Sequence, residues 1–564
     1  MRAWRAAAGA LVVAALAALA LAAAAPPASA QTVRATLIDG GVRLTEPPSY
    51  DRPPPGRRLT ARQALAAADA LAKVRAEKVA HPRAYERAYL REGGGWQVAL
   101  YDGASPARTE LAQVVVSDRS GQVTEAWTGW QVAWPMARGY PGAFGRAVNA
   151  PWIWIGLCVL FVLPFARPPL RLLHLDLAVL LAFSVSYAFF GAADLGVSVP
   201  SAYPLLAYVL ARMLLVAGRR SRVLAGRTPP APVQRLVVGD GFLALAIVFL
   251  TGFRIALNVT DGNVIDVGYA GVIGADRITG AGELYGSFPA DNQHGDTYGP
   301  VAYAAYVPFR LLFGWSGAWD DLPAAHAAAL AFDLGSAALA FLIGRRLGGR
   351  SLGLLLAYLW TAFPFTLLAA NSGANDSLVA LLVLAAILAA GRPVARGALV
   401  ALAALTKFAP LALAPLFAGT RHRRLAAAGF AAALALCLAP LAAAGELGTA
   451  YDRTLGFQAS SVSPLSIWGY YGLPHGLQVA AELAAVALAL AVAVVPRRRD
   501  TASLAALAAA VLIALQLTVE HWFYLYLVWF APLVWIAVLT PEPGAGSARS
   551  SRPAGAPSSG SAPR

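Results

Sequence analysis

The sequence of 564 residues is poor in charge, because only 13% of its residues are Asp, Glu, Lys or Arg, against about a quarter in soluble domains. Hydrophobic residues make up 58% of the chain, and the mean hydropathy is +0.57. This composition excludes an ordinary soluble domain and is typical of a polytopic membrane protein. The formal charge of +15 would suggest a nucleic-acid partner in a soluble chain. In a membrane protein it reports orientation instead, so no nucleic acid is expected.

Cysteines and metal-binding patterns are also scarce. Cys158 and Cys437 lie in apolar runs, so neither a disulfide framework nor a Cys-ligated metal site has the residues that it needs. The sequence has no histidine cluster and no Asp-x-Asp motif in its first predicted external loop. We therefore expect no metal and no other cofactor. Of the three lysines, only Lys407 lies in an apolar segment, where a charge is costly and usually has a function.

Residues 1–30 have the pattern of a secretory signal peptide. Arg2 and Arg5 precede an apolar run over residues 10–25, and Ala-Ser-Ala at 28–30 provides a small-x-small cleavage site. An uncleaved membrane anchor is the alternative interpretation. Both interpretations place the following segment outside the cytoplasm.

Residues 31–150 contain no spanning stretch and predict a small extracytoplasmic α+β module. Thr60 is a plausible N-cap for an alanine-rich helix that reaches about Lys78. Strand patterns follow at 96–100, 111–116 and 122–127. The module resembles a PepSY-like domain in its helix, its central Trp96 strand and its final hairpin. It has no clustered nucleophile, base or metal ligands, so we expect a spacer or a docking site for a protein partner.

The rest of the chain predicts eleven membrane spans. These runs are apolar, and most have about the 17 to 25 residues that cross a bilayer. The predicted spans are 152–166, 172–190, 200–217, 236–257, 324–343, 351–370, 377–390, 425–444, 477–495, 501–519 and 522–539. We interpret two further apolar stretches, 298–313 and 398–417, as re-entrant or interfacial. If either crossed alone, the arginine clusters after it would lie outside the cell.

With eleven spans, the arginine clusters of the loops fall almost entirely on one side and the acidic residues on the other. This is the distribution that the positive-inside rule requires. It predicts a plasma-membrane protein with the N-terminal module outside and the C-terminus in the cytoplasm. The tail over 541–564 is rich in Gly, Ser, Pro and Ala, which predicts disorder.

The longest external loop, 258–323, concentrates acidic and aromatic residues, and loops of this length are usually functional. Asp266 lies about nine residues beyond a span, a stretch from Gly282 to Tyr285 follows, and Tyr298-Gly299-Pro300 precedes an apolar segment. This arrangement resembles the polyprenol-phosphate-sugar-dependent glycosyltransferases of the C superfamily, and most closely glycosyltransferase family 87.

A second block supports the resemblance. Asn371 to Leu378 opens a span, and Thr406-Lys407-Phe408-Ala409-Pro410 is similar to the Lys-x-x-Pro re-entrant element of the family. The resemblance covers roughly 236–539, so that 236–540 would be the glycosyltransferase domain and 151–235 would be additional transmembrane helices. It implies an α-helical polytopic fold of the glycosyltransferase C type.

The implied activity is transfer of a hexose, such as mannose, from a polyprenyl-phosphate donor to an extracytoplasmic lipid, glycan or protein. Such a reaction needs a carboxylate that takes the acceptor proton and cationic groups that bind the departing phosphate. The resemblance assigns the base to Asp266. Candidates for the donor phosphate are Lys407, Arg453 and His521. Candidates for substrate contacts are Asp276, Tyr285, Tyr298, Asn375, Asp376, Ser466 and Trp468.

Each candidate also has a structural interpretation. Asp266 could be a solvated loop carboxylate, Lys407 a side chain that snorkels to the interface, and Asp276 a surface partner of Arg277. Asn375 and Asp376 are typical of a helix start. Asp333, Asp240 and Arg254 are predicted structural ion-pair residues, with Asp333 facing the site or pairing with His326.

Two other function classes remain open. A transporter or flippase would need charged residues along a path at the bilayer midplane and preferably two related halves, and the sequence shows neither. A non-enzymatic scaffold for envelope assembly would tolerate substitution of Asp266, Lys407 and Arg453. A protein glycosyltransferase of the same superfamily would differ only in its acceptor.

Overall fold

The computed structural model describes residues 38–39, 42–92, 94–104, 109–134, 138, 146–168, 170–229, 236–419, 422–460 and 462–543. The predicted signal peptide and the tail from residue 544 lie outside the described residues. The chain forms two compact units. Of the described residues, the first unit contains those up to 138 together with 187–199 and 455–472, and the second unit contains the others.

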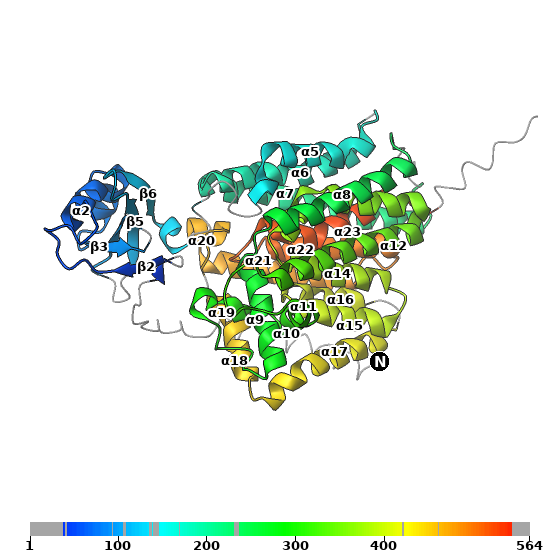
Figure 1. Ribbon diagram of the computed structural model, residues 1–564. Helices are drawn as coiled ribbons and strands as arrows, with labels where there is room; N and C mark the ends of the chain where they lie inside the picture. Colours follow the sequence, from blue (N-terminus) through cyan, green and yellow to red (C-terminus); the bar gives the residue numbers. More distant parts are fainter. Residues whose placement is uncertain are drawn as a thin grey trace, which may run out of the picture. The chain divides into compact units, whose positions relative to one another are not determined.

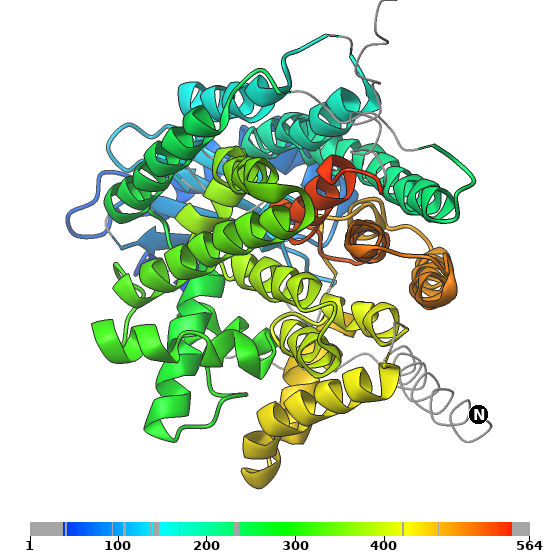
Figure 2. The same ribbon diagram turned by 90° about the vertical axis from the view of Figure 1, so that its right-hand side faces the viewer.

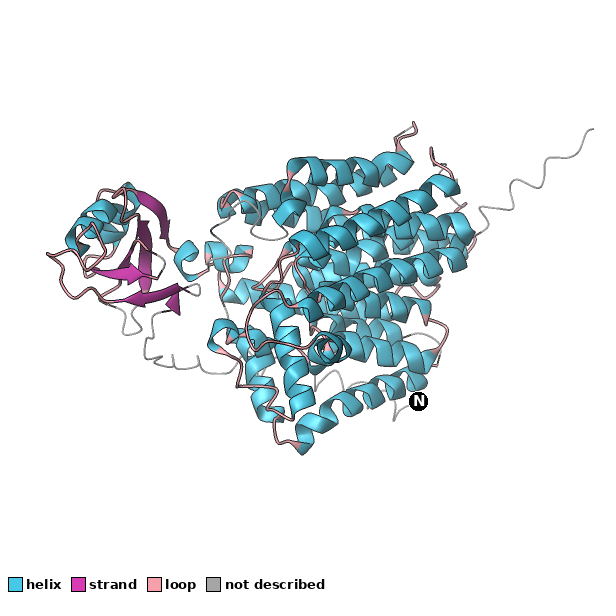
Figure 3. Ribbon diagram, in the orientation of Figure 1, coloured by secondary structure: helices cyan, strands magenta, loops and turns pink. Residues whose placement is uncertain are grey.

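The first unit contains a six-stranded antiparallel sheet in which the strands follow one another in chain order, drawn in magenta in Figure 3. The strands are β1 (Ile38–Asp39), β2 (Val42–Thr45), β3 (Tyr85–Arg91), β4 (Trp96–Tyr101), β5 (Glu110–Val116) and β6 (Val123–Thr128). Helices α2 (Ala61–Asp69) and α3 (Ala72–Ala80) pack on one face. The buried Trp96 belongs to the core between helices and sheet.

The start of α2 has the cap that the sequence predicts. The Thr60 hydroxyl accepts a hydrogen bond from the Gln63 backbone N–H at 3.1 Å, and the Gln63 side chain accepts one from the Thr60 backbone at 2.9 Å. This reciprocal capping box satisfies two N–H groups that a helix end leaves open. The predicted single helix is divided, because α2 ends before Ala70 and α3 begins at Ala72.

The second unit is a bundle of helices, in which α12, α14, α15 and α17 pack in that order, from green to yellow in Figures 1 and 2. Among the described residues, six helices are long and apolar enough to cross a membrane, by length and composition. They are α6 (Leu172–Gly191), α7 (Leu195–Leu224), α8 (Asp240–Asp261), α12 (Pro323–Ala362), α17 (Arg423–Ala443) and α21 (His475–Val494). Shorter apolar helices are α5 (Pro151–Val162), α14 (Asp376–Leu388), α15 (Pro393–Ala404), α22 (Thr501–Gln516) and α23 (Leu527–Leu539).

Every predicted span overlaps a helix, so the helical membrane fold is confirmed, while the number of eleven crossings stays a prediction. The described residues also form shorter connecting helices. They are α4 (Trp130–Ala133), α9 (Asp266–Gly280), α10 (Pro300–Ala304), α11 (Val307–Phe313), α13 (Pro364–Asn371), α16 (Ala414–Ala418), α18 (Leu447–Tyr451), α19 (Phe457–Ser460) and α20 (Ile467–Tyr471).

Helix α12 consists of two legs that meet at Gly348 and Gly349, whose backbone angles are not helical. A Cβ atom on Gly344 would lie 2.6 Å from the Leu352 carbonyl oxygen, and one on Gly353 would lie 2.8 Å from the Phe341 carbonyl oxygen. The legs are therefore antiparallel and in backbone contact at the turn. The first leg covers the predicted span 324–343, whereas the predicted span 351–370 is divided at Phe363 between the second leg and helix α13 (Pro364–Asn371).

A buried ion pair joins α8 to both legs of α12. The Arg254 guanidinium donates to both carboxylate oxygens of Asp333 and, at 3.1 Å, to the Thr361 carbonyl, and the Trp360 indole donates to Asp333 at 2.9 Å. Both charged residues are almost fully buried. Arg254 and Asp333 are thus structural ion-pair residues, as predicted for each of them, and the structure shows that they pair with each other. The alternative partner of Asp333 is wrong, because His326 contacts Asn258 instead, at 3.1 Å.

Candidate active site

The start of α9 is fixed against the turn that precedes α14. The Asn263 N–H donates to the Asn371 carbonyl at 2.8 Å, and the Ile265 N–H donates to the Ser372 carbonyl at 3.0 Å. A Cβ atom on Gly268 would lie only 2.4 Å from the carbonyl oxygen of Gly373, so the two backbones require glycine at this contact. This contact brings the first residues of α9 and α14, Asp266 and Asp376, into the same region.

Asp266 is the first residue of α9, and its side chain is exposed. The surrounding protein nevertheless desolvates the carboxyl and raises its pKa above the ordinary value. The Asp376 charge also raises this pKa, whereas the backbone N–H of Val267 and the charge of Lys407 lower it. An accessible carboxylate that keeps some affinity for a proton has the properties of a general base.

Lys407 lies in a break between helices rather than on a continuous helix. Helix α15 ends at Ala404, and a short 3-10 turn begins at Ala409. The Gly299 N–H donates to the Thr406 carbonyl at 3.3 Å, and the Val301 N–H donates to the Leu405 carbonyl at 3.1 Å. The predicted re-entrant elements at 298–313 and 398–417 therefore meet at these backbone hydrogen bonds.

The ammonium of Lys407 forms a salt bridge with Asp376. The Nζ atom lies 2.7 Å from Oδ1 of Asp376, which also accepts a hydrogen bond from the Trp529 indole at 3.0 Å. Lys407 is 8% exposed and Asp376 is fully buried. Lys407 is thus anchored within the protein, and the snorkelling interpretation of its side chain is wrong.

Three aromatic rings surround the Lys407 ammonium. Its Nζ lies 5.4 Å from the ring centroid of Tyr298, 5.3 Å from that of Tyr526 and 5.6 Å from that of Trp529. Cation–π attraction at these distances stabilises the positive charge where water is largely excluded. Tyr526 stacks on Trp529, with centroids 4.4 Å apart, and His521 contacts Tyr526 edge to face at 6.3 Å.

Two ionisable groups at this site keep one protonation state at neutral pH. Burial, and then the charge of Asp266, raises the pKa of Tyr298 well above its ordinary value. Burial, together with the charge of Lys407, lowers the pKa of His521 to about 4. Tyr298 is therefore a neutral hydroxyl and His521 a neutral imidazole. We call the following residues the acid–lysine cluster: Asp266, Tyr298, Asp376, Lys407, His521, Tyr526 and Trp529.

Several polar atoms beside the salt bridge are unpaired in the part of the chain that the structure describes. The second carboxylate oxygen of Asp376 and both polar atoms of the Asn375 amide are buried without a hydrogen-bond partner among the described residues. Asn375 occupies the N-cap position of α14, but its side chain does not cap the helix. Leaving buried polar atoms unpaired costs about 1 to 3 kcal/mol each. These atoms are thus available to a polar ligand or to water.

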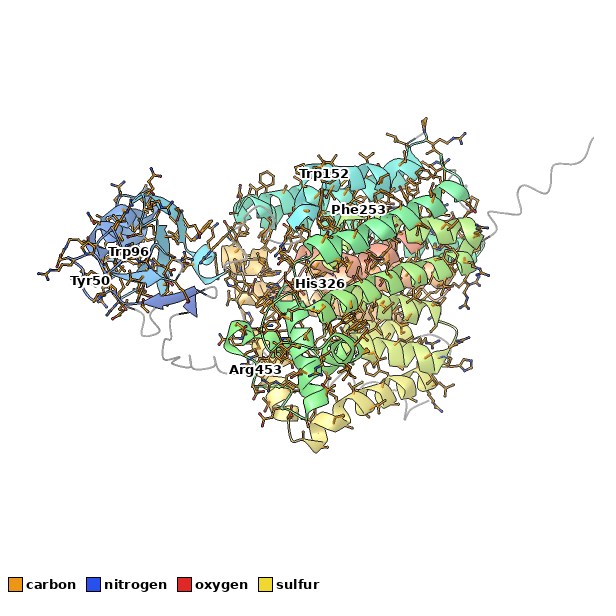
Figure 4. All side chains as sticks on the ribbon, viewed as in Figure 1. Tyr50, Trp96, Trp152, Phe253, His326 and Arg453 are labelled. Atoms are coloured by element: carbon orange, nitrogen blue, oxygen red, sulfur yellow. The ribbon has the colours of Figure 1, made fainter. Side chains whose placement is uncertain are left out.

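Arg453 lies outside the loop that carries Tyr298 but forms an ion pair with a residue of that loop. Its guanidinium, labelled in Figure 4, donates to the two carboxylate oxygens of the buried Asp296 at 2.7 and 2.8 Å. The Gly286 N–H donates to Asp296 at 2.7 Å, and the Tyr285 hydroxyl donates to the Tyr298 carbonyl at 3.0 Å. Arg453 and Tyr285 therefore support the position of Tyr298 from the side of the loop.

The remaining candidates lie in structural contacts. Asp276 forms an ion pair with Arg310 at 2.9 Å, so its predicted pairing with Arg277 is wrong. Arg277 instead donates to the Ser287 hydroxyl and backbone, because the chain turns back after α9. Ser466 and Trp468 belong to the first unit. Ser466 is buried and caps α20 by accepting the Gly469 N–H at 3.1 Å, and Trp468 is buried.

Sequence reasoning missed Tyr526, Trp529 and Asp296. The two aromatic residues stand three positions apart, so they share a helix face, but their run resembles an ordinary interfacial aromatic belt. No sequence signal distinguishes Asp296 from the other acids of its loop. Among the described residues, no three His, Cys, Asp or Glu side chains converge as metal ligands would.

The fold and this cluster are those of a polytopic membrane protein with a polar site built from helix breaks and connecting loops. Comparison with protein families gives a more specific result: residues 297–540 match glycosyltransferase family 87. The match covers somewhat less than half of the chain and supports a membrane glycosyltransferase. It includes Asp376, Lys407, His521 and Trp529, whereas Asp266 precedes it. No curated protein matches the chain significantly.

Proposed function

We propose that the protein transfers a hexose, such as mannose, from a polyprenyl-phosphate donor to a hydroxyl group of an extracytoplasmic lipid, glycan or protein. The observation that carries this proposal is the acid–lysine cluster within the fold matched to glycosyltransferase family 87. Asp266 and Lys407 are 141 positions apart in the sequence, yet the charge of one acts on the pKa of the other.

Asp266 is the proposed general base. As the acceptor oxygen bonds to the anomeric carbon, its proton passes to the Asp266 carboxylate. The bond between the anomeric carbon and the phosphate oxygen breaks at the same time, and polyprenyl phosphate leaves with the bonding electrons. The raised pKa of Asp266 supports this role, because it increases the affinity of the carboxylate for the acceptor proton.

Lys407 is the proposed contact for the departing phosphate. An ammonium has three N–H donors, and among the described residues Asp376 is the carboxylate that accepts one of them. A charge-assisted bond from a second donor to a phosphate oxygen would stabilise the leaving group. The unpaired amide of Asn375 is a candidate for a sugar hydroxyl. This mechanism requires no metal and no cofactor.

The proposed location is the plasma membrane, with the N-terminal module outside and the arginine-rich loops inside. The arginine distribution supports this orientation. In this arrangement the sheet unit is free to dock a protein partner or the acceptor. Asp276, Ser466 and Trp468 remain candidate substrate contacts, although each has a structural role of its own.

The test is transfer of radiolabelled sugar from polyprenyl-phosphate donors in membranes that contain the wild type or Asp266→Asn at matched expression. A general base contributes about 10² to 10⁴ to the rate, so Asp266→Asn should lose product by at least a hundredfold. Asp321→Asn is the control, because it removes an exposed carboxylate from the same connection between α8 and α12. Equal transfer by wild type and Asp266→Asn would reject Asp266. No transfer from any donor by the wild type would favour the scaffold or transporter alternatives.

A further inference from the structure

An apolar groove lies between α7, α21 and α22, in the second unit and built from residues outside the acid–lysine cluster. Its volume is about 280 Å³. The residues that line it are Leu214, Gly218, Leu488, Ala491, Val492, Val495, Pro496 and Leu507. None of them is polar. A Cβ atom on Gly218 would meet no atom within 4 Å, so the groove is open at this position.

Exposed arginines lie at one end of this groove. On α7, Leu214, Gly218 and Arg222 are spaced by four residues, which places them in a row on one helix face. Arg222 is exposed and lies one turn beyond Gly218. Arg498, two residues after Pro496, is also exposed and donates to the Leu224 carbonyl at 3.0 Å. Both arginines are therefore near the C-terminal end of α7, at the same end of the groove.

The neighbouring arginines of α7 have different partners, which sets Arg222 apart. Arg219 pairs with Glu542 at 2.8 Å, and the buried Arg220 pairs with Asp500 at 2.6 Å. Arg220 also donates to the Thr540 carbonyl at 2.8 Å. These contacts fix the ends of α7, α22 and α23 together. The positive charge of Arg222 and Arg498 at the groove is not balanced by a carboxylate in an ion pair among the described residues.

We propose that this groove binds one anionic phospholipid of the bilayer. One acyl chain lies along the apolar residues, and the phosphate of the headgroup contacts Arg222 and Arg498. Apolar helix faces in a bilayer are covered by lipid tails, and basic residues at the end of such a face attract anionic headgroups. Each such arginine contributes about 1 kcal/mol near a membrane surface. That contribution corresponds to about a fivefold change in affinity.

The test uses the full-length protein in detergent and measures binding of phosphatidylglycerol by native mass spectrometry. Phosphatidylcholine with the same acyl chains is the zwitterionic comparison. Arg222→Gln with Arg498→Gln removes the headgroup contacts, and Arg222→Gln alone keeps the Arg498 bond to the backbone. Gly218→Leu fills the groove without a predicted clash. The control is Arg345→Gln with Arg350→Gln, which removes two exposed arginines at the turn of α12.

We expect one tightly bound phosphatidylglycerol, about 25-fold weaker binding in the double groove variant and about fivefold weaker binding in Arg222→Gln. Gly218→Leu should weaken binding of both lipids, whereas the control pair should leave binding unchanged. Equal losses in the groove and control pairs would indicate attraction by net charge and overturn the proposal. Preferential binding of polyprenyl phosphate by at least tenfold would also overturn it, because the occupant would then be a donor-type lipid.

Discussion

The ammonium of Lys407 lies 2.7 Å from the carboxylate of Asp376, and this salt bridge is closed off by Tyr298, Tyr526 and Trp529. The lysine comes from a helix break and the aspartate from the first turn of α14. A charge buried in this way keeps its place only as long as its partner is present. The position of the Lys407 ammonium therefore depends on Asp376, which belongs to a different helix.

Asp376→Asn should destabilise the protein and reduce transfer. Removal of one partner of a buried ion pair costs about 3 to 5 kcal/mol, because the other charge remains buried without compensation. We expect the double variant Asp376→Asn with Lys407→Met to unfold at a higher temperature than Asp376→Asn alone, in detergent. Thermal unfolding of the three proteins measures this coupling. A double variant that is no more stable than Asp376→Asn would show that the pair is not coupled.

The pH dependence of transfer should reflect Asp266. Its pKa is raised in the folded protein, so the ionised base is lost as the pH falls through a value above the ordinary range of an aspartate. The acidic limb of the rate profile should therefore lie at a higher pH than an unperturbed carboxylate would give. Asp266→Glu should retain an acidic limb in its pH–rate profile, with the midpoint at a different pH from that of the wild type. A wild-type rate that is constant down to the ordinary aspartate pKa would contradict this assignment.

The raised pKa of Asp266 also determines how its ionisation changes the stability of the folded protein with pH. A carboxyl that is harder to ionise in the folded state than in the unfolded state lowers stability as the pH rises through its folded pKa. Asp266→Asn should thus be as stable as the wild type or slightly more stable at neutral pH. Thermal unfolding at pH 7 tests this, and it distinguishes loss of the base from loss of the fold in the transfer assay. A markedly lower unfolding temperature for Asp266→Asn would contradict the expectation.

Gly299→Ala should disturb the site through the backbone. A Cβ atom at this position would lie 2.0 Å from the Leu405 carbonyl oxygen, so the connection that carries Tyr298 must move away from the lysine segment. We expect transfer to fall by more than tenfold. Gly280→Ala is the matched control, because a Cβ atom there meets nothing within 4 Å. The measurement is the transfer rate per folded protein of the two alanine variants. Equal rates for Gly299→Ala and Gly280→Ala would contradict the prediction.

Arg254→Met should destabilise the bundle by about 3 to 5 kcal/mol, because Asp333 would stay buried without its cation. Arg254→Met with Asp333→Leu should recover most of this loss. The comparison pair is Arg310 and Asp276, each about one third exposed, whose disruption should cost under about 1 kcal/mol. Denaturation in mixed micelles measures the difference. Similar losses at the two pairs would contradict the argument from burial.

The helical architecture could be predicted because long apolar runs have few alternatives in a bilayer. Lys407 could also be singled out from the sequence, since a single lysine in an apolar segment is conspicuous, whereas its role in the reaction stays a prediction. Its partner could not, because several acids were available and only the packing of α14 against α15 selects Asp376. Trp529 lies 153 positions from Asp376, and no local pattern reveals a contact of that range.

In the sheet unit, the sequence patterns predict some strands but not others. Strands β4, β5 and β6 have apolar or alternating patterns and were predictable, whereas β3 was not. Its sequence, Tyr-Glu-Arg-Ala-Tyr-Leu-Arg, places the charged Glu86 and Arg91 in half-buried positions and Arg87 in an exposed position beside strand β4. Strand β3 forms because its backbone pairs with β4 along most of its length, from Tyr85 opposite Tyr101 to Leu90 opposite Trp96. The residue pattern of β3 alone does not predict a strand.

The hydrogen bonds from Gly299 and Val301 to Thr406 and Leu405 have a mechanical consequence. They join the chain that carries an aromatic wall of the site to the chain that carries its cation, without the participation of any side chain. Substitution of the Thr406 or Leu405 side chain therefore leaves this backbone link in place. The alignment of the aromatic wall with the cation depends on main-chain geometry rather than on the residue types at these two positions.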